Sequence, residues 1–105
     1  MQLLPDELRR ALPPLYSQEY VTNPIAPAKF FAPDSSWTWL VTEGSPEADE
    51  FLFFGYVIGQ EEEWGYFALL EAVQGPLRLP IERDLYFRPG PFSQVLARLR
   101  GERSG

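Results

Sequence analysis

The chain of 105 residues contains no cysteine and no histidine. These two absences exclude disulfide bonds, thiol nucleophiles, imidazole bases, Cys/His zinc sites and haem ligation by histidine. A metal ion could be bound only through carboxylate, carbonyl or amide oxygens, which favours magnesium, calcium or manganese. No apolar run approaches the roughly 20 residues of a membrane span, and no signal-peptide leader opens the sequence. We therefore expect a soluble cytoplasmic protein with no cofactor.

Aromatic residues make up 15% of the sequence and hydrophobic residues 45%, which is typical of a single globular domain over residues 1–105. The net charge is −6, and it is unevenly distributed. Residues 1–77 carry twelve acidic and three basic side chains, whereas residues 78–105 carry three acidic and six basic ones. The acids gather beside expected turns, at residues 47–50 and 61–63. Such groups are typical of solvated loop tips; the alternative is an acidic surface that meets a basic partner.

Two segments have the apolar spacing of helices that pack on a core. Residues 3–12 form a short amphipathic stripe, which Pro13 ends. Residues 92–99 have apolar side chains at i, i+3, i+4 and i+7, after a start signal at Gly90-Pro91 and before an expected stop at Gly101. We expect both helices to cover the same face of a sheet.

Four further segments have the alternation or apolar content of strands: 28–32, 37–43, 51–58 and 63–69. Residues 51–58 are apolar on both faces, which favours a central strand covered on both sides. A single helical turn is expected at 70–74, and residues 81–87 are open between a strand and an extended segment. Together these elements predict a small α+β domain, with an antiparallel sheet of three to five strands and an N-terminal and a C-terminal helix packed on it.

The first candidate site is the segment from Lys29 to Glu43. Asp34 and Glu43 could pair for acid–base or metal chemistry; alternatively Asp34 caps a turn and Glu43 ends a strand. Trp37 and Trp39 share one strand face, where they could stack on bases or sugars, anchor a protein interface or pack in the core. Lys29 begins its strand, where it could meet either carboxylate in a weak surface ion pair. Binding and structural roles are both open for this segment.

The second candidate site is the segment of residues 80–88, in which Arg83 and Asp84 stand beside aromatic residues. It could hold an active-site arginine clamped by a carboxylate, or an ion-pair network that ties the last strand to the helix. Neither segment contains a phosphate-binding loop, a nucleophile elbow or metal-spaced ligands, so we predict no catalytic residue, no metal site and no enzymatic activity. A magnesium-dependent hydrolase built on Asp34, Glu43 and Asp84 is the enzymatic alternative.

Four segments in this order are similar to a known family: KFFAPDSSWTWLVTE at 29–43, FGYV at 54–57, LEAVQGPL at 70–77 and LPIERDLYF at 79–87. Together they resemble the small bacterial proteins called domain of unknown function 2958, over residues 12–96. The resemblance implies no established activity or substrate. It implies an association with plasmids and other mobile elements, near genes for conjugation or defence evasion.

The acidic surface and the many aromatic residues favour a non-catalytic domain that binds another protein, for example an anti-restriction or anti-defence factor of a mobile element. This hypothesis predicts that Trp37 or Trp39 lies partly exposed in an apolar patch. The alternative is a single-stranded nucleic-acid-binding module that stacks bases on these two indoles and contacts phosphates through Lys29, Arg83 and Arg88. The excess of acid argues against that alternative, because phosphate contacts dominate such affinities. The oligomeric state is left open.

Overall fold

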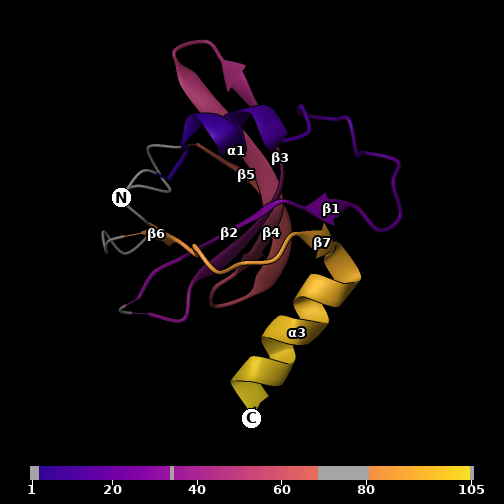
Figure 1. The fold of residues 1–105 in the computed structure, drawn as a ribbon, viewed down its shortest axis with the longest axis vertical. Coiled ribbons are helices and arrows are strands. Elements are labelled where there is room, and N and C mark those ends of the chain that lie inside the picture. The colour runs from indigo at the N-terminus through magenta and orange to yellow at the C-terminus, as the bar shows by residue number, and fades with distance from the viewer. Residues whose placement is uncertain (1–2, 34, 69–80, 105) are drawn as a thin grey trace.

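The fold is built on a twisted antiparallel sheet, as the computed structural model in Figure 1 shows. The structure describes residues 3–33, 35–68 and 81–104. Within these ranges five strands lie in the order β5-β4-β3-β2-β6, and β1 pairs with β7 in a small second sheet. Their bounds are Ile25–Ala26 (β1), Ala28–Phe31 (β2), Thr38–Glu47 (β3), Glu50–Ile58 (β4), Glu62–Ala68 (β5), Glu82–Arg83 (β6) and Gly90–Pro91 (β7). The predicted α+β class is confirmed.

In the described ranges two helices flank the sheet in sequence, α1 at Asp6–Ala11 and α3 at Phe92–Ser104. In α1 the acidic residues lie in the first turn and the basic ones in the last, as the helix dipole favours. α3 begins directly after Pro91 but continues through Gly101, so the predicted stop at Gly101 is wrong. A glycine costs about 1 kcal/mol relative to alanine inside a helix, which lowers stability without forcing an end. The helical turn expected at 70–74 lies outside the described residues.

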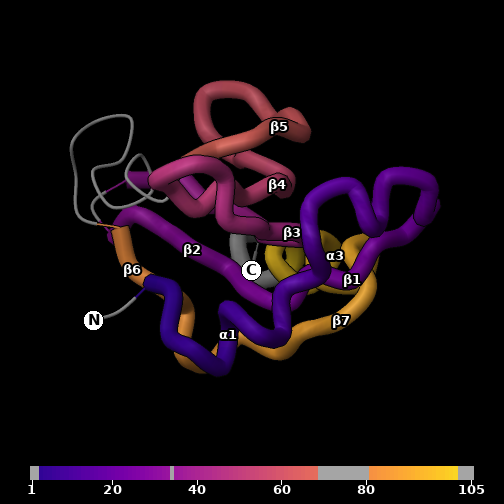
Figure 2. The backbone as a smooth tube through the Cα atoms, turned by 90° about the horizontal axis from the view of Figure 1, so that it is seen from above, coloured from indigo at the N-terminus to yellow at the C-terminus, as the bar shows by residue number. Residues whose placement is uncertain are grey.

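The sheet is packed on both faces. Leu40 and Val41 are adjacent on β3 and therefore point to opposite faces. Val41 belongs to the cluster against which Leu8 of α1 packs, whereas Leu40 belongs to the cluster that contains Val95 of α3. Figure 2 shows β2 running between the two helices. The expectation that both helices cover one face is therefore wrong, because β3 and β4 are apolar on both sides and each side needs cover.

β4 occupies an interior position between β3 and β5, as predicted, but its two faces differ in burial. Phe51 and Phe53 are buried on the α1 face. On the α3 face Ile58 is buried, while Phe54 and Tyr56 are only half-buried. The prediction that this strand is covered on both sides is therefore only partly correct, since α3 leaves part of one face open to solvent.

A β-bulge interrupts the pairing of β3 with β4. Val41 lies opposite Gly55 and Glu43 lies opposite Phe54, so Thr42 is the extra residue. The hydroxyl of Thr42 donates to the carbonyl of Phe54 at 3.1 Å. A shift by one residue reverses the side-chain alternation of a strand. Glu43 consequently shares the open face with Phe54 instead of the α1 face with Val41.

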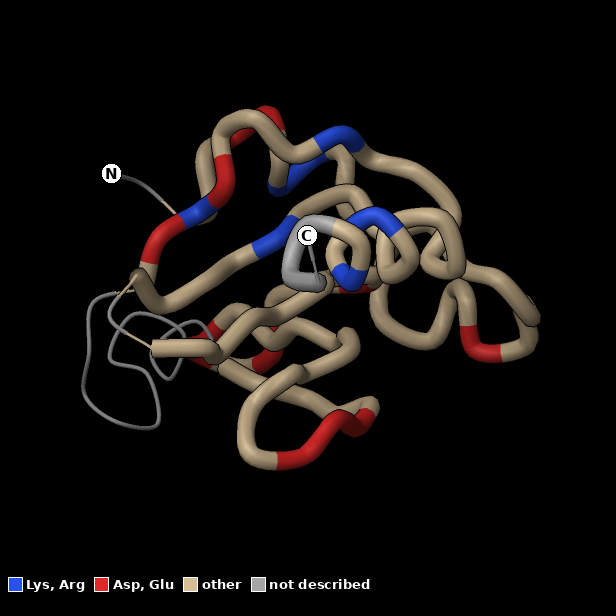
Figure 3. The backbone as a smooth tube through the Cα atoms, turned by 90° about the horizontal axis from the view of Figure 1, so that it is seen from below, with Lys and Arg blue, Asp and Glu red and all other residues tan. Residues whose placement is uncertain are grey.

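Figure 3 marks the positions of the acidic and basic residues along the backbone. The acidic groups at 47–50 and 61–63 are exposed around the β3–β4 and β4–β5 turns, as predicted. Basic residues Arg98 and Arg100 lie on α3. In the ranges that the structure describes, no helix has the length and apolarity needed to cross a bilayer.

Candidate functional site

A groove of about 390 Å³ opens over β4 and β5, beside the loop of residues 13–24. Four aromatic rings and two carboxylates give its lining a distinct chemistry. We call it the aromatic groove and define it by Tyr16, Glu19, Glu43, Phe54, Trp64 and Tyr66. It occupies the part of the sheet face that α3 leaves uncovered.

The rings of the aromatic groove form one connected surface. Tyr66 lies directly opposite Phe54 in the β4–β5 register, and their centroids are 4.8 Å apart. Phe54 is nearly parallel to Trp64 at 5.7 Å, and Tyr16 approaches Tyr66 at 6.3 Å. Tyr16, Trp64 and Tyr66 are 57%, 41% and 52% exposed. Trp64 also contacts Phe92 of α3, with ring centroids 4.6 Å apart. These large aromatic side chains are therefore held together at the surface and are only partly covered by the described part of the chain.

Glu43 fixes the loop that forms the other wall of the groove. Glu43 is 4% exposed. Its two carboxylate oxygens accept hydrogen bonds from the backbone N–H groups of Tyr16 at 2.8 Å and Gln18 at 2.7 Å. Tyr16 has a φ of 70°, in the left-handed region that non-glycine residues seldom adopt. Charge-assisted hydrogen bonds of this kind are among the stronger ones in proteins. The bulge that re-aims Glu43 thus also holds a strained loop in place.

Gln18 adds a second set of bonds between this loop and the sheet. Its side-chain amide donates to the carbonyl of Thr42 at 2.9 Å and accepts the N–H of Ile25 at 2.8 Å. The loop is therefore bound through both its backbone and its side chains. A binding surface held in this way loses little conformational freedom when a ligand arrives.

The electrostatic character of the aromatic groove is negative. Partial shielding from water raises the pKa of the Tyr66 hydroxyl, and Tyr16, Glu43 and Glu19 raise it further. No lysine or arginine is among the described residues that line the groove. The ion pairs found in the described ranges, Lys29–Asp84 and Arg100–Glu62, involve none of its carboxylates.

Lys29 and Asp84, which come from the two different candidate segments, meet in the structure. Lys29 Nζ lies 3.4 Å from Asp84 Oδ2, and the backbone N–H of Asp84 donates to the carbonyl of Lys29 at 3.0 Å. The contact arises because β6 pairs with β2. Lys29 therefore pairs with Asp84 and not with Glu43, and Asp34 lies outside the described residues.

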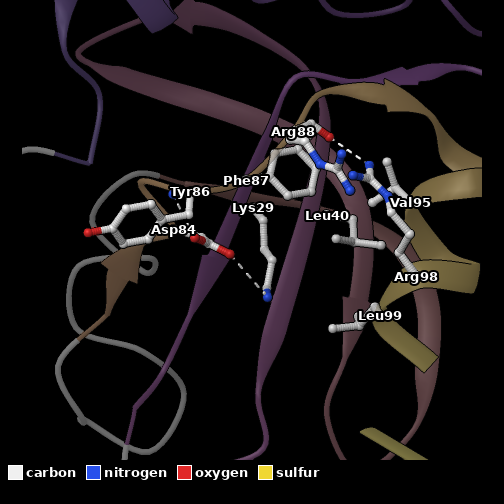
Figure 4. A pocket seen from close by; sticks show the side chains of 9 residues that line it. All are labelled: Lys29, Leu40, Asp84, Tyr86, Phe87, Arg88, Val95, Arg98 and Leu99. Atoms are coloured by element: carbon white, nitrogen blue, oxygen red, sulfur yellow. Dashed lines mark hydrogen bonds and ion pairs between the residues drawn. The ribbon is translucent and has the colours of Figure 1, made fainter. Parts of the chain in front are cut away.

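Figure 4 shows this ion pair at the side of a small pocket of about 80 Å³ between β2 and α3. Arg98 Nη2 donates to the carbonyl of Arg88 at 2.7 Å. Asp84 also accepts the backbone N–H of Tyr86 at 2.9 Å. The ion pair ties the segment after β6 to β2, and the Arg98 hydrogen bond ties it to α3.

The other predicted site residues do not share one surface. Trp39 is 4% exposed, and its ring stacks with that of half-buried Trp37 at 6.0 Å. Arg83 lies opposite Phe30 in the register and so on its face of the sheet, whereas Lys29, the neighbour of Phe30, points to the other face. The nucleic-acid hypothesis needs both indoles exposed and the basic residues beside them. The structure stacks the two indoles but buries Trp39. Lys29 and Arg88 line one pocket, whereas Arg83 lies on the other face of the sheet.

The carboxylates proposed for a hydrolase have separate structural roles. Glu43 binds the loop of residues 13–24, and Asp84 pairs with Lys29. Over residues 3–33, 35–68 and 81–104, no group of three or more acidic, histidine or cysteine side chains converges on a possible metal site.

Sequence reasoning missed the aromatic groove, although one signal for it was present. The alternation over residues 63–69 places Trp64 and Tyr66 on one face of the strand and Phe67 on the other. Of these three residues, Phe67 is the buried one. That pattern gives the two faces but not which of them the rest of the chain covers. Tyr16 carried no signal, because it joins the groove through the contact of its backbone with Glu43.

Comparison with known proteins identifies the family. A family model with the description "Protein of unknown function (DUF2958)" matches residues 3–100, nearly the whole chain. The search of curated proteins and the search of solved structures gave no match. The resemblance seen in the sequence is confirmed, and it supplies no ligand or activity for the groove.

Proposed function

We propose that this chain, which belongs to the DUF2958 family of unknown function, is a non-catalytic protein-interaction domain. Because the family supplies no function, the proposal is based on the surface of the molecule. The observation that carries this proposal is the aromatic groove. Three of its aromatic side chains are 41–57% exposed and lie in one connected ring cluster. Exposed apolar clusters of this kind usually mark interaction surfaces.

The physical basis of binding is the burial of these rings. Removing apolar surface from water contributes about 25 cal/mol per Å², and aromatic residues are enriched at the centres of protein interfaces. The bonds from Glu43 and Gln18 hold one wall of the groove in advance of binding. A partner would therefore gain contact area at a small cost in ordering this wall.

The family resemblance directs the choice of partner to test. Association with plasmids and other mobile elements makes host proteins of restriction and defence one class of partner for this domain. The proposal itself requires only that the partner be a protein and that it contact the aromatic groove.

The test is affinity capture from cell lysate, with and without nuclease treatment, by the full chain tagged at its N-terminus, read by mass spectrometry. The double variant Trp64→Ala/Tyr66→Ala removes two exposed rings of the groove. A matched control, Leu85→Ala/Tyr86→Ala, removes side chains that are 58% and 93% exposed after β6. We expect a stoichiometric protein partner that is lost with the groove variant and retained with the control, while circular dichroism shows both variants folded.

Two outcomes would contradict the proposal. A partner retained by the Trp64→Ala/Tyr66→Ala variant would show that recognition occurs elsewhere on the surface. Recovery that disappears with nuclease would favour nucleic-acid binding instead of protein binding.

A further inference from the structure

We propose, on the basis of the interaction function proposed above, that the aromatic groove holds a lysine or arginine side chain of the partner protein. The partner would thus be recognised through a basic side chain seated among aromatic rings and carboxylates. Three features of the described residues support this assignment: the arrangement of the rings, the uncompensated negative charge and the size of the groove.

The rings provide the faces on which a cation is stabilised. The centroids of Tyr16 and Phe54 lie 6.3 Å and 4.8 Å from that of Tyr66, and Trp64 adjoins Phe54. The negative face of an aromatic ring attracts an ammonium or guanidinium group within about 6 Å. An arginine side chain can also stack its plane on such a ring. Several partly exposed aromatic rings in one groove are therefore suited to a basic side chain.

The carboxylates give the same preference through their charge. Glu43 is 4% exposed, and the two backbone N–H groups that bind it fix its position without removing its negative charge. Glu19 adds a second carboxylate, which is exposed, to the lining. The described lining contains no lysine or arginine to balance them. A basic side chain from outside would supply the missing positive charge.

Other classes of occupant fit less well. A phosphate group or another anion would approach two carboxylates and would be repelled. A purely apolar segment would cover Glu43 without providing a counter-charge, which is costly for a buried ion. The groove volume of about 390 Å³ lies within the common range of ligand sites, about 300–1,000 Å³, so a single long side chain and its flanking backbone can enter.

The first measurement compares two probes of the same shape that differ in one charge. ¹⁵N-labelled full-length protein is titrated with Nα-acetyl-arginine amide and, separately, with Nα-acetyl-citrulline amide, its neutral analogue. The indole N–H of Trp64 and the backbone N–H groups of Tyr16 and Gln18 report on the groove. We expect saturable shifts at these groups and binding of the cationic probe that is tighter by at least about threefold. Nα-acetyl-lysine amide should behave like the arginine probe.

Salt and matched variants separate charge from shape. Raising the ionic strength from about 50 mM to about 500 mM should weaken the arginine probe and leave the citrulline probe unchanged. Glu19→Gln removes an exposed carboxylate of the groove and should weaken the arginine probe about twofold or more. Glu63→Gln, which neutralises an exposed carboxylate outside the lining, should leave its affinity unchanged. Tyr66→Phe should retain binding and Tyr66→Ala should lose it, because the ring face is what the cation contacts.

Several results would overturn the inference. Equal affinity for the arginine and citrulline probes would show that charge has no part in recognition. Shifts that map to the pocket beside Lys29 would place the probe at the wrong site. Shifts of the groove signals that depend only on protein concentration would assign the groove to a second copy of the chain. A protein partner that needs Trp64 and Tyr66 but is indifferent to its basic residues would refute this inference and leave the proposed function intact.

Discussion

Gly55 and Gly65 face each other across the β4–β5 pair, yet alanine should be tolerated at only one of them. A Cβ atom built on Gly55 would lie 2.2 Å from the carbonyl oxygen of Leu40 and 3.0 Å from the Cα of Val41. Both are backbone atoms of the interior strand β3, so they cannot rotate away. A Cβ atom on Gly65 would have nothing within 4 Å. The two substitutions change the same chemistry and differ only in the space available.

The expected magnitude follows from what must move. Overpacking a core costs about 1–3 kcal/mol even when side chains can adjust. Here β3 itself must shift beside the bulge, which strains ladder hydrogen bonds worth about 0.5–1.5 kcal/mol each. We expect Gly55→Ala to lower the free energy of unfolding by about 3 kcal/mol. Gly65→Ala should change it by no more than about 1 kcal/mol, in the stabilising direction if the unfolded chain loses freedom.

Urea unfolding followed by tryptophan fluorescence measures both variants under identical conditions. The Gly55→Ala variant should also shift the backbone N–H signals of Tyr16 and Gln18, because the bulge positions the carboxylate that binds them. If Gly55→Ala unfolds at the wild-type urea concentration, or if Gly65→Ala is equally damaging, the close approach of β3 to β4 is not what requires glycine at this position.

Two further predictions concern Glu43 and two tyrosine hydroxyls. Glu43→Gln leaves one acceptor oxygen and turns an amide donor toward an N–H group, so it should lower the free energy of unfolding by about 1.5–3 kcal/mol; an unchanged urea midpoint would contradict this. Partial shielding from water is also the largest cause that raises the pKa of Tyr56, followed by Glu62, and the pKa of Tyr66 is raised as described above. Because the folded protein then keeps protons that the unfolded chain releases, stability should fall as the pH rises above 10.0. The double variant Tyr56→Phe/Tyr66→Phe should show a smaller fall in urea unfolding, and an equal or steeper one would refute the assignment.

Much of the fold could be predicted because its elements depend on local patterns. The alternation over residues 63–69 correctly opposed Phe67 to Trp64 and Tyr66, and the apolar run at 51–58 correctly indicated an interior strand. The placement of the two helices on opposite faces of the sheet could not be predicted. The apolar stripe of a helix indicates that the helix packs on a core, but it does not indicate against which face of the sheet. The helix end expected at Gly101 was wrong because the low helix propensity of glycine is a weak local preference, and the helix continues through this residue.

The site was harder to predict because its residues meet through non-local contacts. Lys29 and Asp84 were both proposed from the sequence, but their contact depends on the pairing of β6 with β2. Glu43 was proposed as a possible partner of Asp34, whereas the bulge turns it toward Phe54 and the loop. The alternation of apolar and polar residues did not reveal the β-bulge at Thr42, which shifts the strand register by one residue. The burial of Trp39 likewise depends on the whole core and not on its neighbours in the chain.

The loop of residues 13–24, which forms one wall of the groove, is hydrogen-bonded at its C-terminal end to α3. Asn23 accepts the backbone N–H of Ser93 at 2.9 Å and donates to its hydroxyl at 2.8 Å, across 70 positions of sequence. The carbonyl of Pro24 also accepts the N–H of Phe92 at 2.7 Å. Trimming or displacing α3 would therefore release one anchor of this wall of the groove while the Glu43 anchor stayed in place. A fusion or tag at the C-terminus can thus disturb the groove from a distance, and the affinity measurements proposed above are best made with that end unmodified.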